Sequence, residues 1–161
     1  MLFDYKTTIT KYNNPTGILS TSYAGQKQGE VWGFVSDGLI AEQAEANRIN
    51  TGKIQQAISA QVWKTGDVRY MDLNKDGLIT FGANTVDNPG DRKVIGNTTP
   101  RYQYGLTLQA EWKGFDFSMF WQGVAERDLM LSGNMFWGFI SGNQSSIFPG
   151  HLDYYRDVDA D

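Results

Sequence analysis

The sequence predicts a mainly β protein, and three observations support this expectation. Residues 102–112 and 115–121 alternate between side chains of two kinds with a period of two, as in a β-strand. Phe, Trp and Tyr make up 14% of the 161 residues, which suits strands whose aromatic side chains stand at an interface. The chain also has 18 glycines and 4 prolines, and the prolines lie near Gly, Asn or Ser clusters typical of turns.

The sequence before the strand that follows Pro100 divides into a first strand and a long region with little strong periodicity. Residues 1–15 begin with Thr, Tyr and other strand formers and end in a turn signal, so we expect one strand there. Residues 16–100 form a long connecting region, and a region of that length without strong periodicity is usually functional or interfacial.

Short elements are expected inside this long region. The Ala, Glu and Gln content of residues 41–49 predicts a short helix, with Ser36 or Asp37 available near its start. A second short helix is expected over residues 53–63. The Gly, Asn, Asp and Pro content of residues 81–100 predicts irregular structure.

Residues 101–123 contain the clearest pattern of the chain, a β-hairpin. In the first strand, one face carries Tyr102, Tyr104, Leu106, Leu108, Ala110 and Trp112, and the other carries Gln103, Thr107, Gln109 and Glu111. In the second strand, Phe115, Phe117, Met119 and Trp121 oppose Asp116, Ser118, Phe120 and Gln122. Lys113 and Gly114 form a tight connection between the strands.

Two interpretations of this hairpin remain open from its pattern. Strands of about 9–11 residues are long enough to cross a bilayer when tilted, and aromatic residues stand at both ends of the apolar face. A hairpin in a soluble β-sandwich alternates in the same way. Residues 124–161 are rich in aromatic residues without clean alternation, which is typical of a loop that packs against something.

Composition argues against several classes of function. The formal net charge is -4 and no Lys/Arg cluster is present, so we expect no nucleic-acid partner. The chain has no cysteine and a single histidine, His151, which excludes thiolate chemistry and a multi-histidine metal centre within it. It shows neither a signal segment at its start nor an apolar run of about 18 residues, so we expect no secretion signal and no membrane-spanning helix.

No arrangement of residues predicts catalysis. Asp153, Asp157 and Asp159 are close in sequence, but their spacing in a loop-like tail does not define a shared site. His151 has no evident nucleophile beside it, and the glycines form no nucleotide-binding motif. We therefore expect no enzyme, no catalytic residues and no organic cofactor.

The stretch MDLNKDGLIT, residues 71–80, resembles the start of a calcium-binding loop. Oxygen ligands at the first, third, fifth and seventh positions would be Asp72, Asn74, Asp76 and the carbonyl of Leu78. The twelfth position, where such loops place a bidentate acid, is Ala83. The alternative is an Asx-rich turn that satisfies its own backbone amides. A structural calcium ion is thus a candidate cofactor, whereas calcium sensing is not expected.

Four stretches in sequence order carry a more specific signal. They are GEVWGFVSDGL (29–39), GDVRYMDLNKDGLITFG (66–82), NPGDRKVIGNTTPRYQYG (88–105) and WKGFDFSMFWQGV (112–124). Together they resemble the C-terminal part of SusC/RagA-type TonB-dependent outer-membrane transporters of the Bacteroidetes. The resemblance runs from about Ile9 to the end of the chain.

This resemblance implies a fold class and a location. The fold would be a partial antiparallel transmembrane β-barrel, a few strands of a barrel of roughly 22, with long extracellular loops that contain short helices. Residues 16–100 and 124–161 would be extracellular, and the turn at Lys113 would be periplasmic because barrel turns on that side are short. The chain would be a fragment of a transporter in the outer membrane. Family members have a long variant of the acidic loop, in which Asp87 or Asp91 would supply the missing carboxylate.

Function and partners follow from the same resemblance. The intact protein would import large nutrients, glycans or peptides, with a SusD-like surface lipoprotein, and would contact TonB through a part absent from this sequence. Outer-membrane lipid would face the apolar side of the hairpin. The alternative function is that of a secreted, calcium-stabilised β-module that binds carbohydrate through exposed Trp and Tyr side chains.

Overall fold

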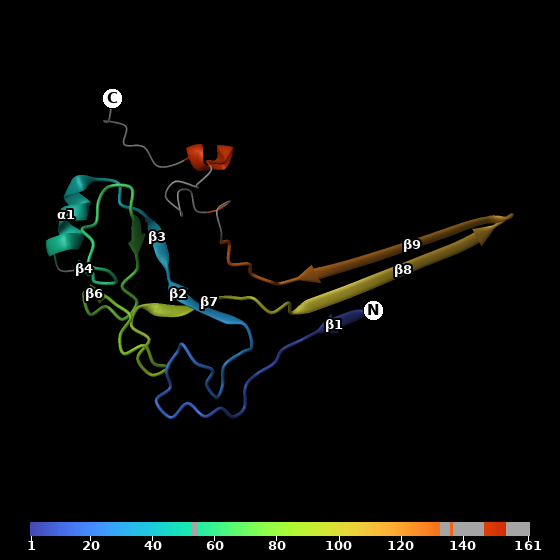
Figure 1. The fold of residues 1–161 in the computed structure, drawn as a ribbon, viewed down its shortest axis with the longest axis horizontal. Coiled ribbons are helices and arrows are strands. Elements are labelled where there is room, and N and C mark those ends of the chain that lie inside the picture. Colours follow the sequence, from blue (N-terminus) through green and yellow to red (C-terminus); the bar gives the residue numbers. More distant parts are fainter. Residues whose placement is uncertain (53–54, 133–135, 137–146, 154–161) are drawn as a thin grey trace. The chain divides into compact units, whose positions relative to one another are not determined.

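The computed structural model describes residues 1–52, 55–132, 136 and 147–153, and its secondary structure is mainly β, as predicted (Figure 1). The chain divides into two compact units. The first unit comprises Met1–Gly33, Asn84–Asp87 and Lys93–Leu129, and the second comprises Phe34–Ala83, Asn88–Arg92 and Met130–Asp161.

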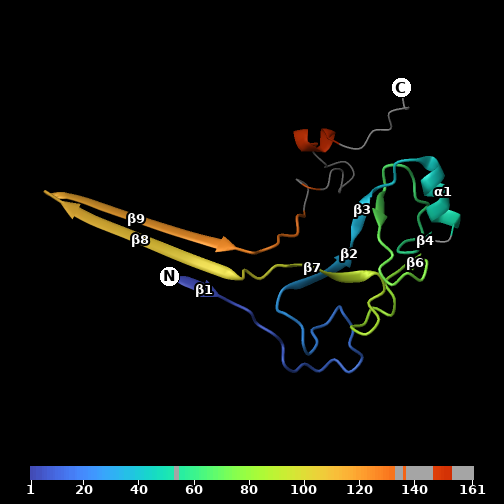
Figure 2. The same cartoon turned by 180° about the vertical axis from the view of Figure 1, so that it is seen from behind.

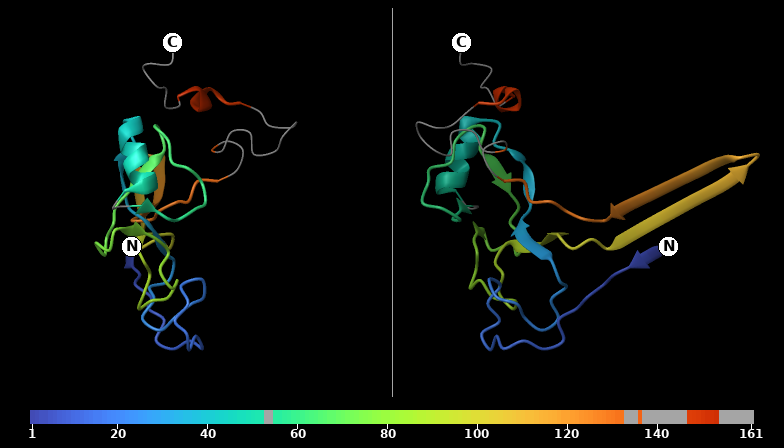
Figure 3. Two further views of the ribbon diagram at one scale, coloured as in Figure 1. Left: turned by 90° about the vertical axis from the view of Figure 1, so that its left-hand side faces the viewer. Right: turned by 45° about the vertical axis from the view of Figure 1, so that its right-hand side comes forward.

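The first unit contains a three-stranded antiparallel sheet in the order β1-β8-β9 (Figure 2). Its strands are β1 (Leu2–Asp4), β8 (Tyr102–Trp112) and β9 (Phe115–Ala125). Lys113 and Gly114 have φ values of 48° and 85°, the left-handed conformation that a two-residue hairpin turn needs at both positions. The turn holds β8 and β9 side by side over their full length (Figure 3).

The register of the hairpin confirms the two faces expected from the sequence. Leu106 lies opposite Trp121 and Leu108 lies opposite Met119. Because directly opposed residues share a face, the apolar residues of both strands form one surface. Thr107 lies opposite Phe120 on the other face, where Glu111 and Asp116 also stand opposite each other.

The strand expected over residues 1–15 is much shorter in the structure. β1 ends at Asp4, and Thr8 forms an isolated bridge with Lys27 instead of continuing along β8. The Ile9 N–H donates to the Gln26 carbonyl, and the Gln28 N–H donates to the Thr7 carbonyl. Residues 7–9 thus exchange backbone hydrogen bonds with residues 25–28, which explains why the chain after Asp4 does not extend the sheet.

Arg101 fastens the ends of all three strands. Its side chain forms ion pairs with Asp4 and Glu126, each at 3.1 Å. Its carbonyl accepts a hydrogen bond from the Tyr5 N–H at 2.8 Å, and its own N–H donates to the Glu126 carbonyl at 3.3 Å. Arg101 therefore connects the end of β1 with the end of β9.

Residues 81–100 are not wholly irregular, contrary to expectation, because they contain β7 (Arg92–Asn97), which pairs with β2 (Glu30–Phe34). A Cβ atom at Gly33 would come within 2.4 Å of Ile95 Cδ1, so only glycine at this position leaves room for the Ile95 side chain. The sequence of β7 shows no clean alternation, and Gly, Asn and Pro lie within it or close to its ends.

A cluster around β2 joins Tyr23, Glu30 and Trp32. The Tyr23 hydroxyl donates to the Glu30 carboxylate, and Trp32 Nε1 donates to the Tyr23 hydroxyl oxygen at 3.0 Å. Burial of Tyr23 and its hydrogen bond to Glu30 raise the pKa of the phenol to about 12.

The second unit combines two small sheets with one helix. β3 (Ser36–Leu39) pairs antiparallel with β5 (Val68–Tyr70), and β4 (Gln55–Gln56) pairs parallel with β6 (Leu78–Ile79). The helix is α1 (Gln43–Thr51). Its buried side chains Ala46 and Ile49 pack with Ile40 and Trp63 into the core of this unit.

The two helix predictions for this unit have different outcomes. α1 confirms the helix expected over residues 41–49, but Glu42 occupies its N-cap position, not Ser36 or Asp37. The second helix, expected over residues 53–63, is absent from the described part of that range. The buried Gln56 side chain explains the difference, because it accepts from the Tyr70 N–H at 2.6 Å and donates to the Val68 carbonyl at 3.2 Å.

After β9, the described residues contain one further element, the 3-10 helix η2 (Pro149–Leu152), which includes His151. Asp157 and Asp159 lie outside the described residues. No helix in the described ranges is both long and apolar enough to span a membrane.

Candidate functional site

The acidic turn, residues 72–78, connects β5 to β6 in the second unit. Lys75 and Gly77 have φ values of 63° and 88°, which lets the chain reverse sharply inside the turn. Gly77 is the sixth residue counted from Asp72, the position at which calcium loops of this type need a glycine.

The side chains of the acidic turn bind its own backbone. Asp72 accepts from the N–H groups of Lys75 and Gly77, at 2.6 and 2.9 Å. Asn74 Oδ1 accepts from the Asp76 N–H at 2.9 Å, and Asp76 Oδ1 accepts from the Leu78 N–H at 2.7 Å. These bonds are those of an Asx-rich turn, the alternative that the sequence left open.

Asp91 is the carboxylate that returns to this turn, whereas Asp87 is exposed and belongs to the first unit. The Asp91 side chain is 0% exposed. Its oxygens accept from the N–H groups of Leu73 and Thr80, both at 2.8 Å. Asp91 therefore binds the backbone at both ends of the acidic turn, although residues 82–90 separate it from the turn in sequence. Ala83, at the twelfth loop position, supplies no carboxylate.

The donor chemistry of the acidic turn suits calcium in kind, because Asp72, Asn74, Asp76 and the Leu78 carbonyl offer only oxygen ligands. Among the described residues, however, no three Asp, Glu, His or Cys side chains gather closely enough to hold a metal ion. A bound ion would thus depend on the amide and carbonyl oxygens as well as on the carboxylates. Calcium binding at the turn stays a prediction.

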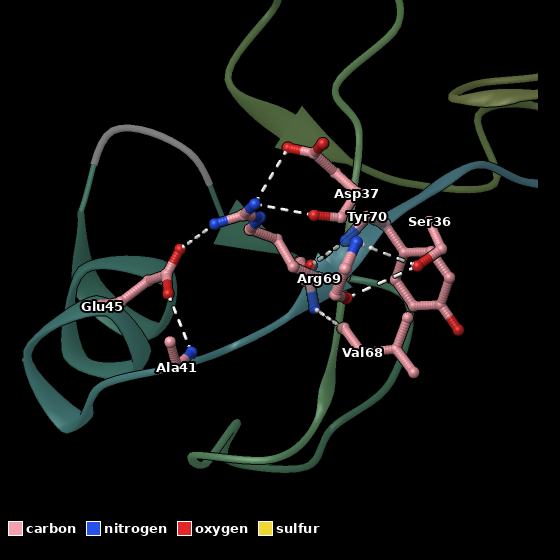
Figure 4. A network of polar contacts seen from close by, with 9 residues as sticks. Ser36, Asp37, Ala41, Glu45, Val68, Arg69 and Tyr70 are labelled. Atoms are coloured by element: carbon pink, nitrogen blue, oxygen red, sulfur yellow. Dashed lines mark hydrogen bonds and ion pairs between the residues drawn. The ribbon is translucent and has the colours of Figure 1, made fainter.

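A second cluster of polar groups surrounds Arg69 on β5 (Figure 4). Arg69 Nη1 donates to Glu45 on α1 at 2.5 Å. Arg69 Nη2 donates to the Asp37 carbonyl at 2.7 Å and lies 3.2 Å from the Asp37 carboxylate on β3. Glu45 also accepts from the Ala41 N–H at 3.1 Å, so one carboxylate serves both the guanidinium and the chain before the helix.

The electrostatics of the Arg69 cluster follow from these contacts. The hydrogen bond from Arg69, supported by the Ala41 N–H, lowers the pKa of Glu45. The same hydrogen bond raises the pKa of Arg69. The Nε atom of Arg69 is buried and has no hydrogen-bond partner among the described residues. The cluster holds α1 against the β3–β5 sheet.

The acidic turn and the Arg69 cluster border one open cleft of about 1070 Å³ in the second unit. Charged groups of both signs line it, together with apolar side chains of Ile49, Met71 and Ile79. The sequence predicted the acidic turn but missed the Arg69 cluster. Asp37, Glu45 and Arg69 are far apart in sequence and form no motif that could have identified them.

No model of a known protein family matches this sequence, and no curated protein resembles it significantly. The SusC/RagA resemblance therefore rests on the four motifs described above and stays a prediction.

Proposed function

We propose that this chain forms part of a TonB-dependent outer-membrane importer of large nutrients, glycans or peptides, that works with a SusD-like lipoprotein. One observation carries the proposal: the apolar face of the β8–β9 hairpin is exposed to solvent. Leu108 is 44% exposed, Phe117 is 55% exposed and Trp112 is 68% exposed. Soluble proteins rarely leave a contiguous apolar surface of this kind uncovered.

The length of the hairpin agrees with a bilayer. Eleven residues span ten rises of about 3.3 Å, and a tilt of about 40° reduces this length to a height of about 25 Å, that of the apolar band of outer-membrane barrels. Tyr102 and Tyr104 at one end, and Trp112 and Phe115 at the other, would stand at the two membrane interfaces. Lipid would then cover the exposed face.

The alternative, a secreted carbohydrate-binding module, explains the hairpin less well. Such a module must bury one face of its strands in a core, since an isolated hairpin is at best marginally stable in water. The buried hydrophobic side chains among the described residues lie elsewhere, at Tyr23, Ile40, Ala46, Ile49, Trp63 and Ile79. The second unit, with its own core, suits the role of an extracellular loop region that contacts the lipoprotein.

The test is to express the full-length transporter with an affinity tag and to follow its location and partners. We expect it in the outer-membrane fraction, with the heat-modifiable electrophoretic mobility of a β-barrel and with a surface lipoprotein that co-purifies in mild detergent. Recovery in the soluble secreted fraction would contradict the importer and favour the secreted module. A barrel that purifies alone would contradict the proposed partner only.

A further inference from the structure

We draw no further inference here: the strongest candidate, the open cleft between the acidic turn and the Arg69 cluster in the second unit, is lined by charged side chains of both signs, and nothing in the structure shows what fills it.

Discussion

If the chain forms the proposed barrel, replacing Leu108 by arginine is the sharpest test of which face of the hairpin meets lipid. β8 runs from Tyr102 to Trp112, so Leu108 lies one residue from the middle of the strand, opposite Met119. Thr107 is its neighbour, and it points to the opposite face because successive strand residues alternate. The pair therefore probes two faces at nearly the same depth.

The expected magnitude follows from that depth. An arginine on the lipid face near the bilayer midplane lowers the free energy of unfolding by about 2–4 kcal/mol. Leu108→Arg should have this effect in the full-length barrel. Thr107→Arg should cost much less, because its guanidinium would enter a polar, hydrated lumen.

The assay is reversible urea unfolding of each purified variant in lipid vesicles, followed by tryptophan fluorescence. Leu108→Arg should have the lower free energy of unfolding, by most of the about 2–4 kcal/mol expected at the midplane. Equal tolerance at Leu108 and Thr107 would show that the lipid-facing side was assigned wrongly. A monomeric chain with this hairpin in a closed soluble core would refute the membrane interpretation itself.

Three further predictions concern other parts of the chain. If the acidic turn holds calcium, calorimetry should detect calcium binding that Asp76→Ala abolishes while the hairpin stays intact; no heat in the wild type would leave only the Asx turn. The free energy of unfolding should fall as the pH rises from 10 to about 12, because Tyr23 keeps its proton in the folded chain and loses it in the unfolded chain. The expected slope is about 1.4 kcal/mol per pH unit. A Tyr23→Phe variant that keeps this slope would refute the assignment. Studied alone, the 161-residue chain should self-associate through β8 and β9, and light scattering that finds a monomer would contradict this.

The hairpin could be predicted almost residue by residue, because both of its signals are local. The alternation fixes which residues share a face, and Lys113–Gly114 fixes the turn that sets the register. The helix at Gln43–Thr51 was predictable for a similar reason, since its composition alone favours a helix.

The elements that were missed depend on contacts between distant residues. Gln56 lies in a stretch with helical composition, but its side chain satisfies backbone groups of β5, and this contact favours an extended backbone. Arg92–Asn97 becomes a strand only because Glu30–Phe34 lies beside it. For the acidic turn, the sequence left Asp87 and Asp91 as equal candidates, and only the folded chain distinguishes the buried Asp91 from the exposed Asp87.

The contacts of Arg101 have a mechanical consequence. Ion pairs as exposed as these contribute little to the free energy of unfolding. Their position matters more than their energy. Arg101 contacts both Asp4, at the end of β1, and Glu126, just after β9. A pull on the chain after Asp4 or after Ala125 would therefore act on this one residue. We expect the ends of β1 and β9 to separate from β8 together rather than one after the other. We therefore expect movement of either connecting segment to reach both outer strands through Arg101.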